Sequence, residues 1–155
     1  MRLSEHFTLE ELTRTEVRQF GNTPGAEGVI KLRVLCELVL EPVRFHFAAP
    51  VVVTSGYRSP PVNKAVGGNP KSQHPLCEAA DFHVIGMDHF SVARWIAKNL
   101  EFDQLILEFV NEAGTAGWIH CSYVGYRKSR GEILVINRSG RKRITVEEIP
   151  VAHAA

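Results

Sequence analysis

Several features that would point to other classes of protein are missing from this 155-residue sequence. The three cysteines, Cys36, Cys77 and Cys121, are odd in number and widely spaced, so no disulfide framework is expected. No apolar run is long enough to span a bilayer, which argues against membrane insertion. The segment Met1–His6 lacks the apolar core of a signal peptide. We therefore expect cytoplasmic synthesis without a signal peptide, with any export by another route.

An excess of charge of one sign is also missing. Lysine and arginine together number 18 and the acidic residues 17, for a net charge of +1 that demands no particular partner. No basic motif interleaved with aromatic residues appears, so no nucleic acid partner is expected. The sequence has no repeat, linker or low-complexity segment, and its 45% hydrophobic content is ordinary for a soluble protein. The prediction is one domain over residues 1–155, acting as a monomer.

Two helices are predicted near the N-terminus. Thr8-Leu9-Glu10-Glu11 reads as a capping box that starts a short helix, with Leu9, Leu12 and Phe20 on one face. A second helix carries a wide apolar stripe and is stopped or kinked near Pro42. Its stripe consists of Ile30, Val34 and Leu38, spaced by four residues, with Leu35 and Val39 beside them.

Strands dominate the rest of the chain. A third helix is predicted from a cap at Asp88 to about Leu100. Residues 58–75 are rich in Gly, Pro, Ser and Asn and predict a long irregular loop, a kind of segment that is commonly functional. The predicted strands cover residues 50–54, 78–85, 102–109, 118–124, 132–137 and 143–149. This order predicts an α+β fold with N-terminal helices packed on a largely antiparallel sheet.

His74, Asp81 and His120 are the leading candidates for metal ligands. Two imidazoles and one carboxylate make a borderline-soft ligand set, and a catalytic zinc site uses three protein ligands with a fourth position left for water. Strand alternation puts His120 and Ser122 on one face and Cys121 on the other, so Cys121 should point away from a metal held by His120.

Two further residues remain open as ligands. Cys77 lies on the turn between His74 and Asp81, where alternation does not exclude it, although a packing role is the simpler interpretation. His83 shares a strand face with Asp81 and could be a ligand, a partner of a ligand or a solvated residue.

The joint order of four motifs raises the specificity of this pattern: Ser55–Ser59 (Ser-Gly-Tyr-Arg-Ser), Ser72–His74 (Ser-Gln-His), Ala79–Asp81 (Ala-Ala-Asp) and Trp118–His120 (Trp-Ile-His). With these motifs the chain resembles the zinc D-alanyl-D-alanine carboxypeptidase family of cell-wall peptidases, especially its short phage-endolysin and prophage branch. It is similar, more distantly, to the hedgehog signalling domain. The resemblance runs from Phe7 to about Tyr123.

The resemblance implies one Zn²⁺ per chain, held by His74, Asp81 and His120, on a hedgehog-like fold. It implies a zinc metallopeptidase that hydrolyses peptidoglycan stem peptides. The cleaved bond would be either D-Ala-D-Ala, as in a carboxypeptidase, or L-Ala-D-Glu, as in an endopeptidase. Action on the cell wall would follow release or export by another route, and a phage or prophage origin is implied.

The general base has two candidates. Many members of the family carry an acidic residue or a second histidine just before the last ligand, but here Gly117 and Trp118 occupy that stretch. The hedgehog-like pattern places a Glu at the end of the preceding strand, and Glu108 matches it. An acidic residue that ends an apolar strand can be buried with a raised pKa, which suits a general base. Glu112 is the second candidate.

Three more residues are candidate substrate contacts. Arg58 matches the arginine of the Ser-Gly-Tyr-Arg motif, and its fork of donors suits a substrate carboxylate or a developing oxyanion, or else a salt bridge that fixes the loop. Ser72 could bind substrate or support the neighbouring ligand. Trp118 would wall the cleft or belong to the core.

Two alternatives to this reading follow from the same residues. The missing acid beside His120 leaves open a catalytically inactive zinc-binding domain that binds cell-wall peptide or a protein partner. The stretch 127–143 holds seven Lys or Arg residues against one acidic residue, Glu132. It is either a surface that attracts anionic wall polymers or nucleic acid, or a solvated hairpin.

Overall fold

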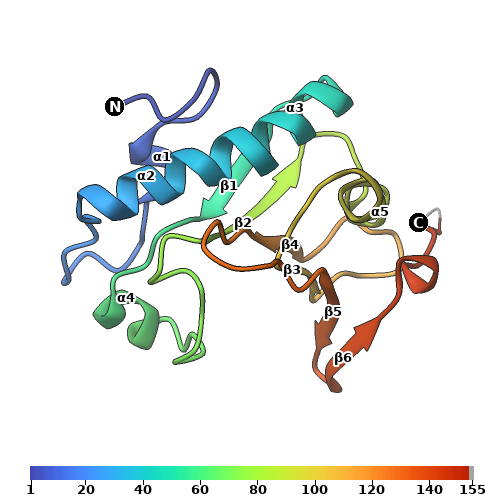
Figure 1. The fold of residues 1–155 in the computed structure, drawn as a ribbon. Coiled ribbons are helices and arrows are strands. Elements are labelled where there is room, and N and C mark those ends of the chain that lie inside the picture. The colour runs from blue at the N-terminus through green and yellow to red at the C-terminus, as the bar shows by residue number, and fades with distance from the viewer. Residues whose placement is uncertain (154–155) are drawn as a thin grey trace.

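The computed structural model describes residues 1–153, in which a layer of helices packs on one six-stranded sheet (Figure 1). The helices are α1 (Leu9–Leu12), α2 (Ala26–Leu35), a π-helical turn (Cys36–Leu40), α3 (Glu41–Phe47), α4 (Pro60–Ala65), α5 (His89–Asn99) and a 3-10 turn (Val146–Glu148). The strands are β1 (Val51–Ser55), β2 (Ala79–Val84), β3 (Gln104–Glu108), β4 (Trp118–Ser122), β5 (Glu132–Asn137) and β6 (Gly140–Ile144). The predicted α+β class is confirmed.

The strands lie in the order β1-β2-β4-β3-β5-β6. Every neighbouring pair is antiparallel except β3 and β5, which run parallel, so the prediction of a largely antiparallel sheet is also confirmed. The hairpin β5–β6 extends the sheet on the β3 side and ends it with an edge strand.

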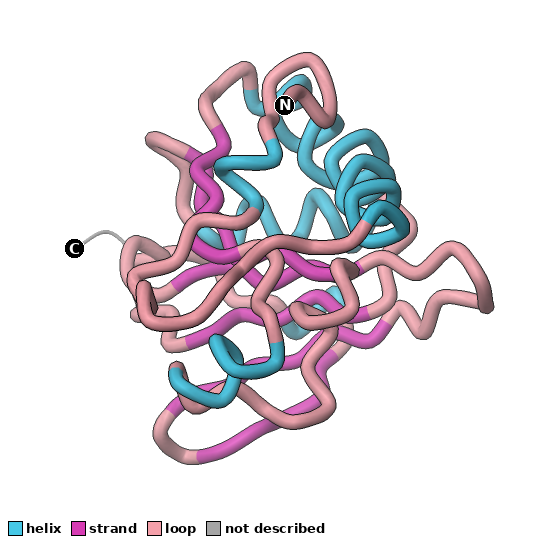
Figure 2. The backbone as a smooth tube through the Cα atoms, turned by 90° about the vertical axis from the view of Figure 1, so that its left-hand side faces the viewer, coloured by secondary structure: helices cyan, strands magenta, loops and turns pink. Residues whose placement is uncertain are grey.

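Alternation along the central strands separates a core face from a polar face. On the core face, Phe82, Leu105 and Ile119 are buried in one hydrophobic cluster with residues of α2, α3 and α5. Figure 2 shows the long α2–α3 helix on one side of the strands. On the opposite face, His120 of β4 pairs in register with Asp81 of β2 and with Ile106 of β3. The polar face is therefore the one on which a site can form.

The N-terminal helices differ from their prediction in length and in buried face. The capping box of Thr8 and Glu11 is present, but α1 ends at Leu12 and Phe20 lies outside it, 42% exposed. In the long helix, Leu35 and Val39 of the predicted stripe are buried, whereas Ile30 and Leu38 are exposed. An α-helix turns through 100° per residue, so a strict four-residue repeat drifts by about 40° at each step and leaves the core face. The buried positions follow a mixed three-and-four spacing: Leu32, Leu35, Cys36, Val39, Leu40 and Val43.

Pro42 neither stops this helix nor leaves it regular. The chain passes through a π-helical turn, Cys36–Leu40, directly before α3, in which Pro42 occupies the first turn. Proline removes one N–H donor and its ring collides with the carbonyl four residues earlier in a regular helix. The wider π turn places this disturbance at the junction of the two helices, so the helical path continues to Phe47.

Two more predicted boundaries are wrong. The loop 58–75 contains the short helix α4, whose first residues are Pro60 and Pro61; proline tolerates the first turn of a helix because the N–H groups there have no helical partner. The last strand covers Gly140–Ile144 rather than 143–149, because a tight turn after Asn137 returns the chain at once to pair with β5.

In the part of the chain that the structure describes, no helix has the length and apolar character needed to cross a membrane.

The corrected helix face gives a matched pair of substitutions. Leu35→Ala should lower the free energy of unfolding by about 2–5 kcal/mol, because it leaves a cavity in the core. Ile30→Ala, on the exposed side of the same helix, should change the free energy of unfolding by less than about 0.5 kcal/mol. Urea denaturation followed by circular dichroism measures both. Equal losses would contradict the assignment of the buried face.

Candidate metal centre and cleft

Three residues predicted from the sequence converge on the polar face of the sheet. Asp81 and His120 are register partners on β2 and β4, and His74 reaches them from the loop between α4 and β2. Asp81 Oδ1 lies 3.2 Å from His74 Nε2 and 2.9 Å from His120 Nδ1. All three side chains are buried, and one potential ligand atom from each lies within 4.8 Å of the others.

The orientation of His74 is set by the backbone of the Ser-Gly-Tyr motif. His74 Nδ1–H donates to the carbonyl oxygen of Gly56 at 2.6 Å, which fixes the tautomer and leaves Nε2 directed at Asp81. Gly56 itself is required because a Cβ there would lie 2.3 Å from the carbonyl oxygen of Leu12. The glycine therefore lets the end of α1 pack against the segment that orients the ligand.

Asp81 carries a negative charge that its neighbours stabilise. Burial alone would raise the pKa of the carboxyl, but the charges and hydrogen bonds of His74 and His120 hold the pKa of Asp81 well below its ordinary value. Its second oxygen, Oδ2, accepts a hydrogen bond from Arg58 Nη2 at 2.8 Å. The ionised carboxylate is thus held from both sides.

Arg58 is committed to this scaffold. Besides Asp81, its guanidinium donates to Ser55 Oγ at 2.8 Å from Nε and to Asn63 Oδ1 at 3.4 Å from Nη1. These contacts fix the loop and the carboxylate, so the salt-bridge interpretation of Arg58 accounts for them. Arg58 also borders the cleft described below, where a contact with substrate stays a prediction.

The donor set fits a zinc ion. Two imidazole nitrogens and one carboxylate oxygen are the ligand types of catalytic zinc, and the two rings approach the same carboxylate oxygen. Among residues 1–153 this is the one group of three or more His, Cys, Asp or Glu side chains arranged to hold a metal. Cys121 is buried in the hydrophobic core, Cys77 packs its sulfur toward Gly28, and His83 lies outside the group.

A cleft of about 630 Å³ opens over these residues. Its volume is in the usual range for small-ligand sites. Ser72, Glu108 and Trp118, all predicted from the sequence, border it together with the three candidate ligands. The remaining walls come from the loop after α4, from β3 and the residue after it, from the loop before β5 and from the β5–β6 hairpin, through Val66, Gly67, Gly68, Asn69, Lys71, Gln73, Gln104, Ile106, Phe109, Arg130, Ile136 and Arg141.

The two candidate bases differ in position. Glu108 ends β3 at the cleft, beside Trp118 in the strand register, whereas Glu112 is exposed on the following loop and does not border the cleft. Burial, and then the nearby charge of Asp81, raise the pKa of Glu108. Gly117 has a φ of 75°, and a Cβ there would lie 2.2 Å from the Glu108 carbonyl oxygen, so the position just before β4 excludes an acidic side chain.

A buried polar network behind the site is centred on Asp103, which the sequence did not single out. Gln73, next to His74, donates to Asp103 Oδ2 at 3.1 Å and to Glu78 at 3.3 Å. Asp103 is fully buried and accepts further hydrogen bonds from Arg127 and Arg130. Burial would raise the pKa of Asp103, but the bonds and charges of these two arginines hold it well below its ordinary value. The available sequence signal for this network was Asp103 itself, a charged residue directly before the strand β3.

Residues 132–143 of the basic stretch form most of the β5–β6 hairpin, one of its two interpretations, and residues 127–131 form the loop before it. Arg127 and Arg130 pair with Asp103, and Arg141 and Arg143 pair with Glu132, so four of its seven cations have partners among the described residues. Because these four cations share two carboxylates, an excess of positive charge remains on this stretch.

A second hollow, of about 770 Å³, lies between the N-terminal segment and α3. Its main acid, Glu41, already accepts hydrogen bonds from Ser4 Oγ, the His6 backbone N–H and the His6 ring. These contacts attach the N-terminal segment to α3 and leave the cleft over His74 as the candidate site.

A comparison with protein families agrees with this geometry. The family model described as Peptidase M15 matches residues 5–122, which include all three candidate ligands and Glu108. The chain belongs to the Peptidase M15 family. Peptidases of this family are zinc-dependent, so this M15 protein is a zinc metallopeptidase, and its His74-Asp81-His120 group could hold one metal ion. A search of curated proteins found no match.

The assignment of His74, Asp81 and His120 as metal ligands predicts which substitutions remove the metal. His120→Ala should remove most of the bound zinc, because it takes away one of three ligands. A Cys77→Ser, Cys121→Ser double variant serves as the control and should retain stoichiometric zinc. Elemental analysis of the purified proteins measures both. Full zinc in the His120 variant, or its loss in the cysteine variant, would overturn the assignment.

The Asp103 network predicts a pH-dependent stability difference. Because the folded pKa of Asp103 is lowered, its stabilisation is complete above the unfolded pKa, about 3.9, and is lost as the pH falls through the folded pKa. Asp103→Asn should therefore cost about 3 kcal/mol of unfolding free energy at neutral pH, with a smaller cost below about pH 4. Urea denaturation across this pH range measures the difference. Glu101→Gln, at an exposed acid nearby, should change stability little, and a pH-independent Asp103 effect would refute the role.

Proposed function

We propose that this M15 peptidase hydrolyses the stem peptides of peptidoglycan, with His74, Asp81 and His120 as the zinc ligands and Glu108 as general base. The observation that carries the proposal is the position of Glu108 in the same cleft as the three buried ligands. The scissile bond is D-Ala-D-Ala or L-Ala-D-Glu, as the family resemblance implies. A phage or prophage origin, a monomeric state and action on the cell wall after release or export are further parts of the proposal.

A zinc ion held by His74, Asp81 and His120 would lower the pKa of a coordinated water to roughly 7 and would polarise the substrate carbonyl. Glu108 takes the proton from the attacking water and passes it to the leaving amine nitrogen, so hydrolysis yields one carboxylate and one amine. Its raised pKa suits both transfers. Arg58 holds Asp81 in place through its 2.8 Å hydrogen bond.

Ser72 and Trp118, the other cleft residues predicted from the sequence, support the ligand loop and form part of the cleft wall. Ser72 accepts a hydrogen bond from the His74 backbone N–H at 3.2 Å, which supports the ligand loop while its hydroxyl borders the cleft. Trp118 stacks at a tilt near Phe109, with ring centroids 5.6 Å apart, and the pair forms an apolar rim beside Glu108. Such a rim limits water at the reacting carbonyl and contacts the apolar parts of a peptide.

Glu108→Gln tests the base. The variant should keep its fold and zinc but lose about two or more orders of magnitude in rate, since the amide keeps the shape and cannot move the proton. The measurement is release of peptides or D-Ala from purified wall and from synthetic stem peptides, read by mass.

Glu112→Gln is the matched control, because it makes the same change four residues away and outside the cleft. It should turn over like the unchanged protein. A normal rate for Glu108→Gln with a loss for Glu112→Gln would exchange the two roles. If the zinc-loaded protein cleaves no stem peptide at all, the inactive binding-domain alternative becomes the better account.

A further inference from the structure

Arg141 is a cleft cation that the fold leaves largely unused. Its side chain is 53% exposed, and among the described residues its ion-pair partner is Glu132, at 3.4 Å from Nη2 to Oε1. The same Oε1 accepts a closer hydrogen bond from Gln104 at 2.7 Å, and the other oxygen of Glu132 accepts from Arg143. One carboxylate thus serves two guanidinium groups. Since a guanidinium has five N–H donors, Arg141 retains donors for a ligand.

The strand register fixes where this cation lies relative to the proposed base. Glu108 on β3 pairs with Ile136 on β5, and Ile136 pairs with Arg141 on β6. All three border the cleft. Neighbouring strands are about 4.8 Å apart, so the backbones of Glu108 and Arg141 are separated by about 10 Å. Arg141 therefore stands at the far wall of the cleft, two strands away from the proposed base.

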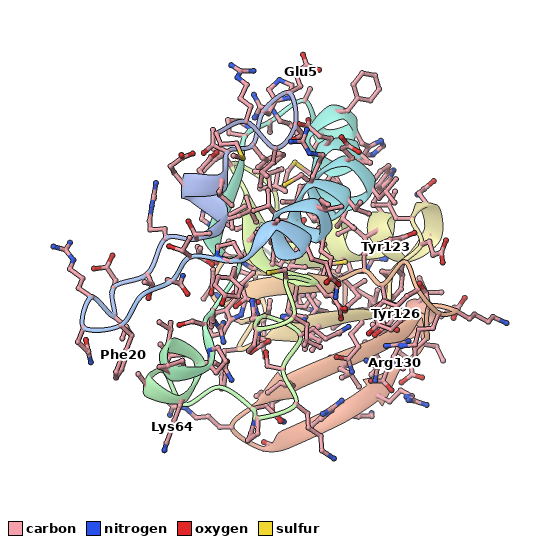
Figure 3. All side chains as sticks on the ribbon, turned by 60° about the vertical axis from the view of Figure 1, so that its left-hand side comes forward. Glu5, Phe20, Lys64, Tyr123, Tyr126 and Arg130 are labelled. Carbon is pink, nitrogen blue, oxygen red and sulfur yellow. The ribbon has the colours of Figure 1, made fainter. Side chains whose placement is uncertain are left out.

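The other two arginines of the cleft, Arg58 and Arg130, form ion pairs with buried carboxylates of the protein. Arg58 is bound to Asp81, Ser55 and Asn63, and Arg130 donates to Asp103 from its backbone N–H, Nε and Nη2. Figure 3 shows Arg130 beside the β5–β6 hairpin, on the side of Tyr126. Of the cleft arginines, Arg141 has the smallest number of contacts in the described chain, and Lys71 adds an exposed cation from the loop after α4.

This wall lies outside the part of the chain that matches the family. The match ends at residue 122, whereas β5 begins at Glu132 and β6 ends at Ile144. The catalytic side of the cleft is thus built by the matched region and the distal wall by the segment that follows it. A wall of this kind is suited to selecting among substrates rather than to performing the reaction.

We propose that Arg141 binds a free carboxylate of the substrate at the far wall of the cleft, away from the scissile amide, and so selects acidic peptides. The role is one of specificity and rests on the proposed function. Its chemical basis is a charge-assisted hydrogen bond, which a carboxamide at the same place cannot equal.

The test compares stem peptides in which each free carboxylate is replaced in turn by a carboxamide. Affinity is measured by calorimetry on zinc-loaded Glu108→Gln protein, and kcat/KM on protein with Glu108 intact. One carboxylate, distant from the scissile bond, should improve binding by about fivefold to tenfold over its carboxamide. Arg141→Gln should reduce this ratio to near one with little effect on the carboxamide peptide. Arg141→Lys, which retains the charge, should restore part of the preference.

Lys142→Gln is the matched control. It removes the same charge from the adjacent residue of β6, which pairs with Val135 and does not border the cleft, so it should leave the ratio unchanged. A ratio that survives in Arg141→Gln, or one that Lys71→Gln abolishes instead, overturns the assignment. Absence of any carboxylate preference in binding overturns it as well. Failure of the proposed function is seen separately, as an absence of cleavage by protein with Glu108 intact, whatever the binding ratio.

Discussion

The buried carboxylate of Asp81 is the interaction on which the rest of the site depends. A charge inside a protein is costly unless it is paired and hydrogen-bonded, and Asp81 is only 4% exposed. Its partners come from three separate segments: Arg58 follows β1, His74 lies on the loop before β2, and His120 lies on β4. Satisfying this one charge therefore ties the long loop to the sheet and brings the two imidazoles together, which is the arrangement that a zinc ion requires.

Two hydrogen bonds from different segments support the candidate ligand His74. The Gly56 carbonyl oxygen accepts from the His74 ring, and Asp103 accepts from the neighbouring Gln73. Asp103 in turn binds Arg130 at the cleft wall, so a continuous set of hydrogen bonds joins the ligand loop to the β5–β6 hairpin. Hydrogen bonds of this type fix the rotamers of ligands and so their geometry for a metal.

The parts predicted well from the sequence are those governed by local periodicity. Alternation along 118–124 separates His120 from Cys121, and β5 begins and ends at the predicted residues because its pattern is short and bounded by turns. The helix face was predicted only in part: Leu35 and Val39 are buried, but Ile30 and Leu38, which follow a strict four-residue repeat, lie on the exposed side of the helix. The Asp103 network joins residues up to 30 positions apart, and such pairing follows from the tertiary fold, which local pattern does not encode. For the same reason a count of basic residues in 127–143 overstated the free charge.

The three arginines that border the cleft differ in how firmly their ion-pair partners hold them. An arginine that faces a buried carboxylate is fixed by it, because separating the pair would leave an uncompensated charge inside the protein. Asp81 and Asp103, both buried, fix Arg58 and Arg130 in this way. Glu132 is shared between Arg141, Arg143 and Gln104, and its 3.4 Å distance to Arg141 is longer than the 2.8 Å and 2.7 Å ion pairs of Arg58 and Arg130, so it holds Arg141 less firmly. Arg58 and Arg130 are thus held by short ion pairs to buried carboxylates, whereas Arg141, at the distal wall of the cleft, keeps donors that can face a substrate.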